Sequence, residues 1–353
     1  MTLTVSIIIN NYNYGRYLSQ AIDSALNQTY PNTEVIVVDD GSTDDSQQVI
    51  ASYGDRISPL LKQNGGQASA LNAGFIISRG EIVIFLDADD YLLPNTVEQV
   101  VAVWQPNVAK VQYRLKMVDG VGKFLCLHPP AELPFDSEEV LPILLESGQY
   151  NTTITSGNAF SRSTLTQVLP IPEAEFRICA DGYLVTLAPF YGQVVSIDQP
   201  LGINRIHGSN FWAISGEAIP VERLRKSIQH DLQKYQFLTT KATEQGYKIT
   251  HQLGSRDYIH LKERLASLRL DWQNHPCPDD VPLDLATKGY WAIWKYTKFP
   301  WKKKLIFSAW FIWVGVMPKP LAQPAIAWLL NSRTRPKTID WLLKKSAISL
   351  PNP

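Results

Sequence analysis

Cysteine is scarce in this sequence of 353 residues. Cys126, Cys179 and Cys277 are the only three, and they are widely spaced. This pattern predicts neither a disulfide framework nor a zinc site, and it is typical of a reducing compartment. The first ten residues, MTLTVSIIIN, lack a basic region and a cleavage site. They predict a first strand rather than a signal peptide, so we expect a cytoplasmic protein.

Two phosphate-binding loops are also missing. The sequence has no G-x-G-x-x-G after its first apolar run and no G-x-x-x-x-G-K-[ST]. The hypotheses that the chain is a dinucleotide-dependent oxidoreductase or a P-loop protein therefore lose their main sequence support. The turn Asn10–Gly15 has no basic, glycine-rich loop of the kind expected in a nucleotidyltransferase that makes sugar nucleotides.

Charge is balanced overall but unevenly distributed. The formal net charge is zero and 45% of the residues are hydrophobic, enough for a substantial core. From Trp291 to Pro353, however, there are eleven Lys or Arg residues and a single acid, Asp340. Such a tail predicts an anionic partner, either a membrane surface or nucleic acid. Its tryptophans lie in apolar runs rather than among the charges, which disfavours nucleic acid.

Apolar runs alternate with helical periodicity along the first hundred residues. Strands are predicted at Val5–Ile9, Glu34–Val38, Ile57–Leu61 and Ile82–Leu86. Helices are predicted at about 17–26 and at 67–78. Two further helices are predicted to begin at the capping pair Ser42 and Asp45 and at Pro94. Short connections between these elements predict an α/β sheet with right-handed crossovers. Later elements are a strand at 110–117 with one solvent-exposed face, a helix at 180–191, a strand at 194–197, and helices at 221–236 and 257–270.

Polar clusters follow three of the predicted strands. They are Asn10–Asn13, Asp39–Asp45 and Asp87–Asp90. In a sheet of this kind ligands gather at the carboxyl ends of the strands. Asp87 and Asp89 can lean toward one point, and two hard oxygen ligands suit Mg²⁺ or Mn²⁺. The alternative is an acidic turn that caps the helix near Pro94.

Seven segments in order resemble the family-2 inverting glycosyltransferases of the GT-A fold. They are VSIIINNYNYGRYLSQAIDSALNQTY, EVIVVDDGSTDDS, NGGQASALNAG, EIVIFLDADD, SGNAF, ADGYL and NRIHGSN, and they span Val5 to Asn210. The resemblance implies a mixed, mostly parallel Rossmann-like α/β sheet flanked by helices. It also implies transfer of a sugar from a nucleoside-diphosphate sugar, with UDP as the expected nucleotide, to an acceptor hydroxyl with inversion.

The resemblance implies specific roles for ten residues. Asn10, Tyr12 and Asp40 would contact the nucleobase and ribose, and Gln67 and Asn72 would face the nucleotide or sugar. Asp87 and Asp89 would form the D-x-D pair that binds Mn²⁺ or Mg²⁺, with Asp89 the more direct ligand. Asp181 would be the general base, although Cys179-Ala180 precede it where the family often has another acid. Arg205 and His207 would contact the diphosphate, and His207 also the metal in some members.

Structural alternatives exist for three of these residues. Asp40 can cap a helix beginning near Ser42, Asp181 can cap the helix that it opens, and His207 can be a structural histidine. The remaining alternative for the whole chain is a catalytically inactive nucleotide-sugar-binding or scaffold protein of the same fold. The expected acceptor is a saccharide or a lipid-linked saccharide, in polysaccharide or glycolipid synthesis.

The sequence predicts three regions. These are a catalytic domain at 1–212, a helical extension at 213–290, and a basic, tryptophan-rich tail at 291–353. Leu305–Met317 is an apolar run of thirteen residues, shorter than the ~20 needed to span a bilayer. With Lys302–Lys304 before it and seven tryptophans between 291 and 341, it predicts a segment lying on an anionic cytoplasmic membrane surface. The alternative is a helical hairpin packed on the catalytic domain.

Overall fold

The computed structural model describes residues 3–131, 133, 135–208, 221–249, 251–330 and 335–337. The chain divides into two compact units. The first contains Met1–Leu141 and Tyr150–Ile206, and the second contains Pro142–Gln149 and His207–Pro353. The predicted boundary at 212/213 lies outside the described residues, as do Ser209 and Asn210 of the last family-like segment.

The first half of the first unit is a parallel sheet. Its strands are β3 (Ser58–Leu61), β2 (Thr33–Asp39), β1 (Val5–Asn11) and β4 (Ile82–Asp87), adjacent in that order. They are joined by α1 (Gly15–Leu26), α2 (Ser46–Ser52) and α3 (Gln67–Ile77). Asn10 on β1 pairs with Val38 on β2 and Asp87 on β4. The carboxyl ends of these strands therefore meet at one edge, as the sequence predicted.

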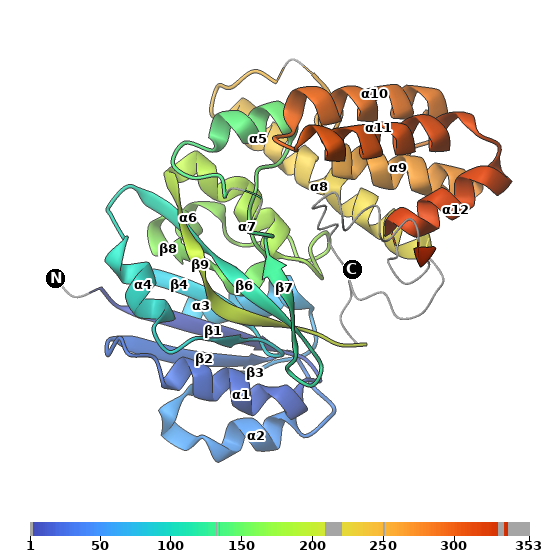
Figure 1. Cartoon of the computed structure of the whole chain (residues 1–353). Helices are drawn as coiled ribbons and strands as arrows, with labels where there is room; N and C mark the ends of the chain where they lie inside the picture. Colours follow the sequence, from blue (N-terminus) through green and yellow to red (C-terminus); the bar gives the residue numbers. More distant parts are fainter. Residues whose placement is uncertain are drawn as a thin grey trace. The chain divides into compact units, whose positions relative to one another are not determined.

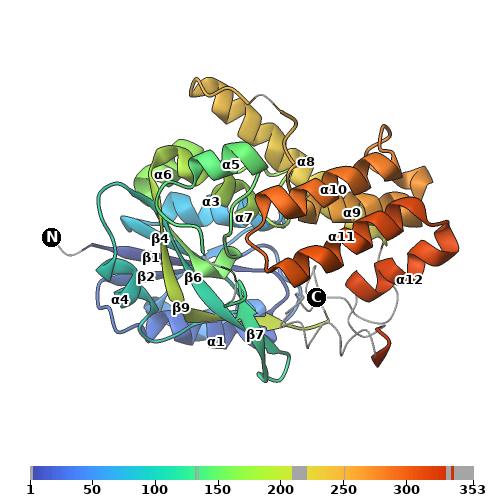
Figure 2. The same ribbon diagram turned by 45° about the horizontal axis from the view of Figure 1, so that its top comes forward.

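Helices cover both faces of this sheet, as Figures 1 and 2 show. Ile7 and Ile9 of β1 share a core cluster with Leu18 and Ile22 of α1, whereas Ile8 points to the opposite face. There α3 approaches so closely that a Cβ on Gly74 would lie 2.4 Å from Cγ2 of Ile8. Because both faces are covered, the strands are apolar at successive positions, and this made them recognisable in the sequence.

The second half of the sheet is mixed. β8 (Asn158–Ser161) is antiparallel to β4 and β6 (Val108–Asp119), and β9 (Gln193–Ile206) is parallel to β6. β5 (Tyr91–Leu92) pairs with β9, and β7 (Phe124–His128) pairs with β6. This nine-stranded, mostly parallel sheet flanked by helices confirms the predicted fold class.

Two strand predictions need correction. β6 has no solvent-exposed face between Val108 and Leu115, because all eight residues are buried and both faces of the strand are therefore covered. β9 is fourteen residues long instead of four. The polar stretch Asp198–Pro200 interrupts its apolar pattern, so only its first part was recognisable. Further helices of this unit are α4 (Thr96–Ala102), α6 (Arg162–Val168) and α7 (Asp181–Leu187), which continues into a 3₁₀ turn, Ala188–Tyr191.

The second unit is helical. It contains α5 (Leu141–Ser147, from Pro142 on), α8 (Val221–Glu244), α9 (Tyr258–Leu270), α10 (Pro282–Tyr296), α11 (Trp301–Val316) and α12 (Lys319–Leu330). The predicted division at 290/291 falls inside α10, which packs on both α9 and α11. The helical extension and the tail are therefore one unit rather than two. No helix in the described part of the chain combines the length and apolar character needed to cross a membrane.

Cys126, Cys179 and Cys277 form no disulfide bond. Cys277 belongs to a small cluster with His275 and Asp280 whose ligand atoms lie within 4.8 Å of one another. Both carboxylate oxygens of Asp280 accept hydrogen bonds from Arg264, and Nε2 of His275 lies 2.8 Å from Oδ2. Since the positive charge of Arg264 already neutralises this carboxylate, we assign the cluster a structural role after α9.

Candidate active site

Asp87 stands at the carboxyl end of β4, beside the end of β1. Its Oδ1 accepts hydrogen bonds from Nδ2 of Asn10 at 3.0 Å and Nε2 of Gln67 at 2.9 Å. Burial, and after it the charges of Asp89 and Asp181, raise the pKa of Asp87 to about 7, although these two hydrogen bonds lower it. Asp89 and Asp181 are thus both close enough to Asp87 to repel it electrostatically.

Asp90 is the structural centre of the acidic turn. Its carboxylate accepts hydrogen bonds from Oγ of Ser156 at 2.6 Å, Nδ2 of Asn204 at 2.9 Å and the backbone N–H of Arg205 at 3.0 Å. Burial, with the charges of Asp89 and Asp87, raises the pKa of Asp90 well above its usual range. Asp90 therefore ties β4 to β9, a role that the sequence did not reveal.

The acidic turn does not cap the following helix. α4 begins at Thr96, two residues after Pro94, and its N-cap residue Asn95 makes no side-chain cap hydrogen bond. Asp87 and Asp90 accept their hydrogen bonds from β1, α3, β9 and the turn at 155–157 instead. The capping alternative for this motif is therefore wrong.

The chemistry of the acidic turn fits a divalent cation. Asp87 and Asp89 offer hard carboxylate oxygens, the ligands that Mg²⁺ and Mn²⁺ prefer. Within the described structure, hydrogen bonds to Asp87 reach only Oδ1, so Oδ2 is available for an ion. Burial, and after it repulsion by Asp89, raise the pKa of Asp87 and of Asp90, and a bound cation would offset this repulsion.

Asp40 anchors the loop that leads into α3. Its oxygens accept hydrogen bonds from Nζ of Lys62 at 2.7 Å and from the backbone N–H groups of Gly65 at 2.9 Å and Gly66 at 2.7 Å. Nδ2 of Asn64 adds another at 3.1 Å. With these partners the carboxylate is nearly saturated, so its predicted contact with a nucleobase stays a prediction and its observed task is to shape the loop.

The helix after β2 begins later than predicted. α2 starts at Ser46, so Ser42 and Asp45 do not form a capping box, and Asp40 does not cap a helix near Ser42. Ser42 instead donates its hydroxyl to Asp39 and accepts the backbone N–H of Asn13 at 2.9 Å. These contacts hold the turn after β1 against the end of β2.

Gln67 connects the acidic turn to α7. Its Nε2 donates to Oδ1 of Asp87 at 2.9 Å, and its Oε1 accepts the backbone N–H of Ala180 at 2.9 Å. The backbone N–H of Gln67 also donates to the carbonyl of Arg177 at 2.7 Å. One amide side chain thus fixes the N-terminus of α7 relative to β4, a different role from the predicted donor contact.

Asp181 is the first residue of α7, and Ala180 occupies the N-cap position. The alternative that Asp181 serves as the N-cap is therefore wrong. Its side chain is partly exposed, and its charge acts on both Asp87 and the buried Lys110. The structure thus brings a partly accessible carboxylate beside the acidic turn.

Arg205 is buried rather than directed into open space. Its guanidinium lies over the ring of Tyr17, 4.6 Å from the centroid, and donates to the backbone carbonyl of Asp89 at 3.2 Å and to Oε1 of Gln20 at 2.6 Å. Arg205 therefore holds the backbone of the acidic turn. His207 is the first residue assigned to the second unit, so its predicted role at the diphosphate or metal stays a prediction.

The other residues predicted to contact the donor nucleotide differ in whether their side chains can still bind a ligand. Tyr12 is 47% exposed, so its ring is free to stack on a base. Oδ1 of Asn10 is buried without a hydrogen-bond partner. Asn72, in contrast, pairs through its amide with both the N–H and the carbonyl of Ile171, at 2.8 and 2.9 Å. Asn72 holds the segment after α6, and we leave it out of the proposed donor site.

Comparison with known proteins agrees with this geometry. The family model "Glycosyl transferase family 2" matches residues 6–139. An uncharacterized glycosyltransferase of Nostoc sp. is 40% identical over 214 residues, covering 59% of this chain and 66% of that protein. A second, from Rickettsia prowazekii, is 48% identical over 99 residues, 28% of this chain and 31% of that protein.

A solved structure shares the fold. S. aureus TarS residues 1–349, in complex with UDP-GlcNAc, superpose with a TM-score of 0.52 at 15% identity, covering 92% of this chain and 90% of that one. The curated relatives are matched over about two thirds of their length or less. From the acidic strand end and these similarities, we conclude that residues 6–139 form a domain of glycosyl transferase family 2, a family of sugar-transferring enzymes, and that the chain shares its fold with TarS.

Proposed function

We propose that this protein transfers a sugar from a nucleoside-diphosphate sugar to an acceptor hydroxyl. One observation carries the proposal. The side chain of Gln67 forms hydrogen bonds both to Asp87 and to the backbone N–H of Ala180, at the start of α7, and so holds Asp181 beside the D-x-D pair. The TarS structure with the same fold holds UDP-GlcNAc, which supports a nucleotide-sugar donor and favours UDP.

The donor nucleotide is proposed to bind at the ends of β1 and β2. Tyr12 offers an exposed ring for stacking on the base, and Oδ1 of Asn10 is a buried acceptor that still lacks a donor. Asp40 shapes the neighbouring loop and is proposed to line the base pocket. Arg205 and His207 are proposed to favour binding of the diphosphate. Arg205 would do so through its positive charge, which lies beneath the acidic turn.

Asp89 and Asp87 are the proposed ligands of Mn²⁺ or Mg²⁺. Such an ion, when bound, supplies positive charge that stabilises the departing nucleoside diphosphate. The buried side of Asp87 is held by Asn10 and Gln67, so the carboxylate keeps one orientation. A carboxylate held in one orientation is prepared to bind an ion that orients the donor phosphates.

Asp181 is the proposed general base. An acceptor hydroxyl is a poor nucleophile at neutral pH, so a carboxylate must accept its proton as it attacks the anomeric carbon. The oxygen–carbon bond forms on one face of the sugar while the bond to the diphosphate breaks on the other. A single displacement of this kind inverts the anomeric configuration and needs no covalent intermediate.

The rival proposal is a catalytically inactive binding protein of the same fold. Incubation with a panel of nucleotide sugars, with and without Mn²⁺, separates the two. The enzyme is expected to release nucleoside diphosphate from one or a few donors in a metal-dependent way. Tight donor binding with no release, even with a saccharide or lipid-linked acceptor present, would favour the binding protein.

We also propose that the second unit docks on an anionic membrane surface, at the cytoplasmic face. α10 and α11 are each apolar on two sides. Phe307, Phe311 and Val314 of α11 are buried, whereas Leu305, Ile312 and Val316 are 48–57% exposed. The buried side matches the alternative of a packed hairpin, although its partners lie within the helical unit. The exposed apolar side of α11 is the part that the membrane proposal addresses.

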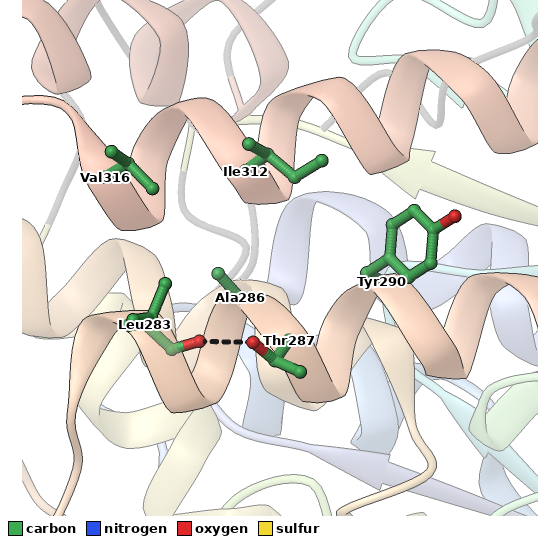
Figure 3. A pocket seen from close by; sticks show the side chains of 6 residues that line it. All are labelled: Leu283, Ala286, Thr287, Tyr290, Ile312 and Val316. Carbon is green, nitrogen blue, oxygen red and sulfur yellow. Dashed lines mark hydrogen bonds between the residues drawn. The ribbon is translucent and has the colours of Figure 1, made fainter.

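The exposed apolar stripes of α10 and α11 meet in one groove of about 250 Å³. Figure 3 shows Leu283, Thr287 and Tyr290 of α10 facing Ile312 and Val316 of α11. Indoles on the same helices are also exposed: Trp291, Trp294, Trp301 and Trp313. Exposed apolar side chains that line one groove are consistent with an interaction site, and tryptophan favours the headgroup level of a bilayer.

The charge of this region favours lipid as the occupant. From Pro282 to Leu330 there are seven lysines and one acid, Asp284. Lys302, Lys303 and Lys304 stand at the start of α11, beside its exposed stripe. Basic residues next to short apolar helices suit attachment in the plane of an anionic interface. Nucleic acid is not proposed as a partner.

The prediction is that Ile312→Glu lowers binding to anionic liposomes at least tenfold, because a charge would enter the apolar interface. Ile76→Glu on α3 is the matched control, since Ile76 is 79% exposed but lies in the first unit. Sedimentation with liposomes at low salt measures both. If the wild-type protein stays in the supernatant, or the two variants bind equally, the membrane proposal is wrong.

A further inference from the structure

The hairpin of β6 and β7 (Figure 2) begins beside the acidic turn. β4 and β6 are both antiparallel to β8, so β6 runs in the same direction as β4, and its carboxyl end lies at the edge of the sheet where Asp87 stands. Val118, near the end of β6, pairs with Arg205 on β9, whose backbone N–H donates to Asp90 at 3.0 Å. The turn of the hairpin therefore lies at the same edge of the sheet as the candidate active site.

Asp119 closes this turn. Its backbone carbonyl accepts the N–H of Gly122 at 2.9 Å, and its backbone N–H donates to the carbonyl of Lys123 at 2.9 Å. Its Oδ1 accepts the backbone N–H groups of Val121 and Lys123 at 3.1 and 2.9 Å. These hydrogen bonds give the turn a defined shape, and they direct the carboxylate toward the backbone of the turn.

The side chains at the tip of the hairpin are apolar and exposed. Val121 is 90% exposed, Phe124 is 54% exposed and Leu125 is 45% exposed. Successive residues of a strand point to opposite faces, so Phe124 and Leu125 leave both faces of β7 uncovered. Among the strands that the structure describes, β7 pairs with β6 alone. The tip therefore presents apolar side chains at its turn and on both of its faces.

The shape and the charge of the tip favour lipid as its partner. A second copy of the chain that paired with the outer edge of β7 would cover that edge and leave Val121 at the turn exposed. A lipid interface, in contrast, surrounds a small protruding tip and covers its turn and both faces together. Lys123 is exposed and Lys116 is partly exposed beside the tip, whereas the carboxylate of Asp119 is engaged with the turn, so the exposed charge suits an anionic surface.

We propose that the tip of the β6–β7 hairpin, residues 119–125, inserts its apolar side chains into the headgroup region of an anionic membrane and so holds the edge that bears Asp87 at the lipid surface. This contact is separate from the one proposed for α10 and α11, because it belongs to the first unit and involves other residues. An acceptor linked to a membrane lipid would then reach the acidic turn directly, a consequence that rests on the proposed function.

The test is Val121→Glu, which places a charge at the most exposed side chain of the tip. Its binding to vesicles of phosphatidylglycerol and phosphatidylcholine in equal parts should weaken by about tenfold or more, since burial of a valine side chain is worth at least that factor. Phe124→Glu should show the same loss. Ile76→Glu on α3 is the matched control and should bind as the wild type does. Melting temperature, and metal-dependent turnover of the donor without vesicles, should be unchanged in all of these variants.

Lys123→Gln tests the contribution of charge at the tip. It should weaken binding to the phosphatidylglycerol vesicles about fivefold at low salt, the expected effect of one lysine near an anionic surface. Binding to vesicles of phosphatidylcholine alone should not change. Equal binding of Lys123→Gln and the wild type to the anionic vesicles would contradict the charge part of the inference.

Equal binding of Val121→Glu and Ile76→Glu, with a loss in Ile312→Glu, would refute the hairpin contact and leave that of the second unit in place. If the wild-type protein stays in the supernatant, both contacts are refuted. A loss of donor turnover in Val121→Glu without vesicles would place the tip in the substrate site instead. A wild-type dimer that Val121→Glu converts to a monomer would identify a second copy as the occupant, and either result overturns the inference. Vesicle binding by a wild-type protein that turns over no donor would refute the proposed function alone.

Discussion

Asp89→Ala is expected to abolish sugar transfer, by about 10³-fold or more, together with metal-dependent binding of the donor. The reason is that a lost carboxylate ligand removes the charge stabilisation that the departing diphosphate requires, a term worth ~3–4 kcal/mol in comparable sites. The fold should survive. Asp89 is the largest charged contribution to the raised pKa of both Asp87 and Asp90, so its removal relieves repulsion at a buried turn.

Calorimetric titration of the donor with and without Mn²⁺ measures the binding part of this prediction, and product release measures the transfer part. Asp55→Ala, at an exposed position after α2, is the control and should behave as the wild type. Near-normal turnover of Asp89→Ala in Mn²⁺ would show that the metal assignment is wrong.

Asp181→Asn is expected to lower kcat by two to four orders of magnitude while donor binding is retained, the usual contribution of a positioned base. The substitution removes a proton acceptor and leaves the backbone of α7 in place. The anchor of that helix is the bond from the N–H of Ala180 to Gln67, which involves no atom of the Asp181 side chain.

Single-turnover transfer and equilibrium donor binding should be measured on the same preparation of Asp181→Asn. Unimpaired transfer would show that another residue is the general base. Loss of donor binding and of thermal stability together would instead make Asp181 a structural residue at the start of α7.

The first half of the sheet was predictable from the sequence because its strands are buried on both faces. Such strands are apolar at successive positions, as in Ile82–Leu86, and the polar residues after them mark the strand ends. The register of β1 with its neighbours then brings Asn10 and Asp87 to the same edge. The location of the candidate site followed from local patterns alone.

The connections within the site were not predictable, because they join residues far apart in the chain. Gln67 bridges Asp87 and Ala180, and Asp90 accepts hydrogen bonds from Ser156 and Asn204. No periodicity or spacing encodes such contacts. For the same reason the sequence predicted a contact of Asp40 with the nucleobase but did not predict its hydrogen bonds to the loop at 62–66, which use most of the hydrogen-bonding capacity of the carboxylate.

The C-terminal region shows a different limit. Its apolar run predicted either a surface helix or a packed hairpin, and α11 has the features of both. One face packs on neighbouring helices and the other is exposed with α10. Composition reports how apolar a segment is, but only the packing reveals which side chains remain uncovered.

The anomeric configuration of the product tests the central claim most directly. NMR of the product formed from a donor of known configuration should show the opposite configuration at the transferred sugar, because the proposed mechanism, with Asp181 as base, is a single displacement from the face opposite the diphosphate. Retention of configuration would contradict the account, since it would require a second displacement or a different site for the chemistry.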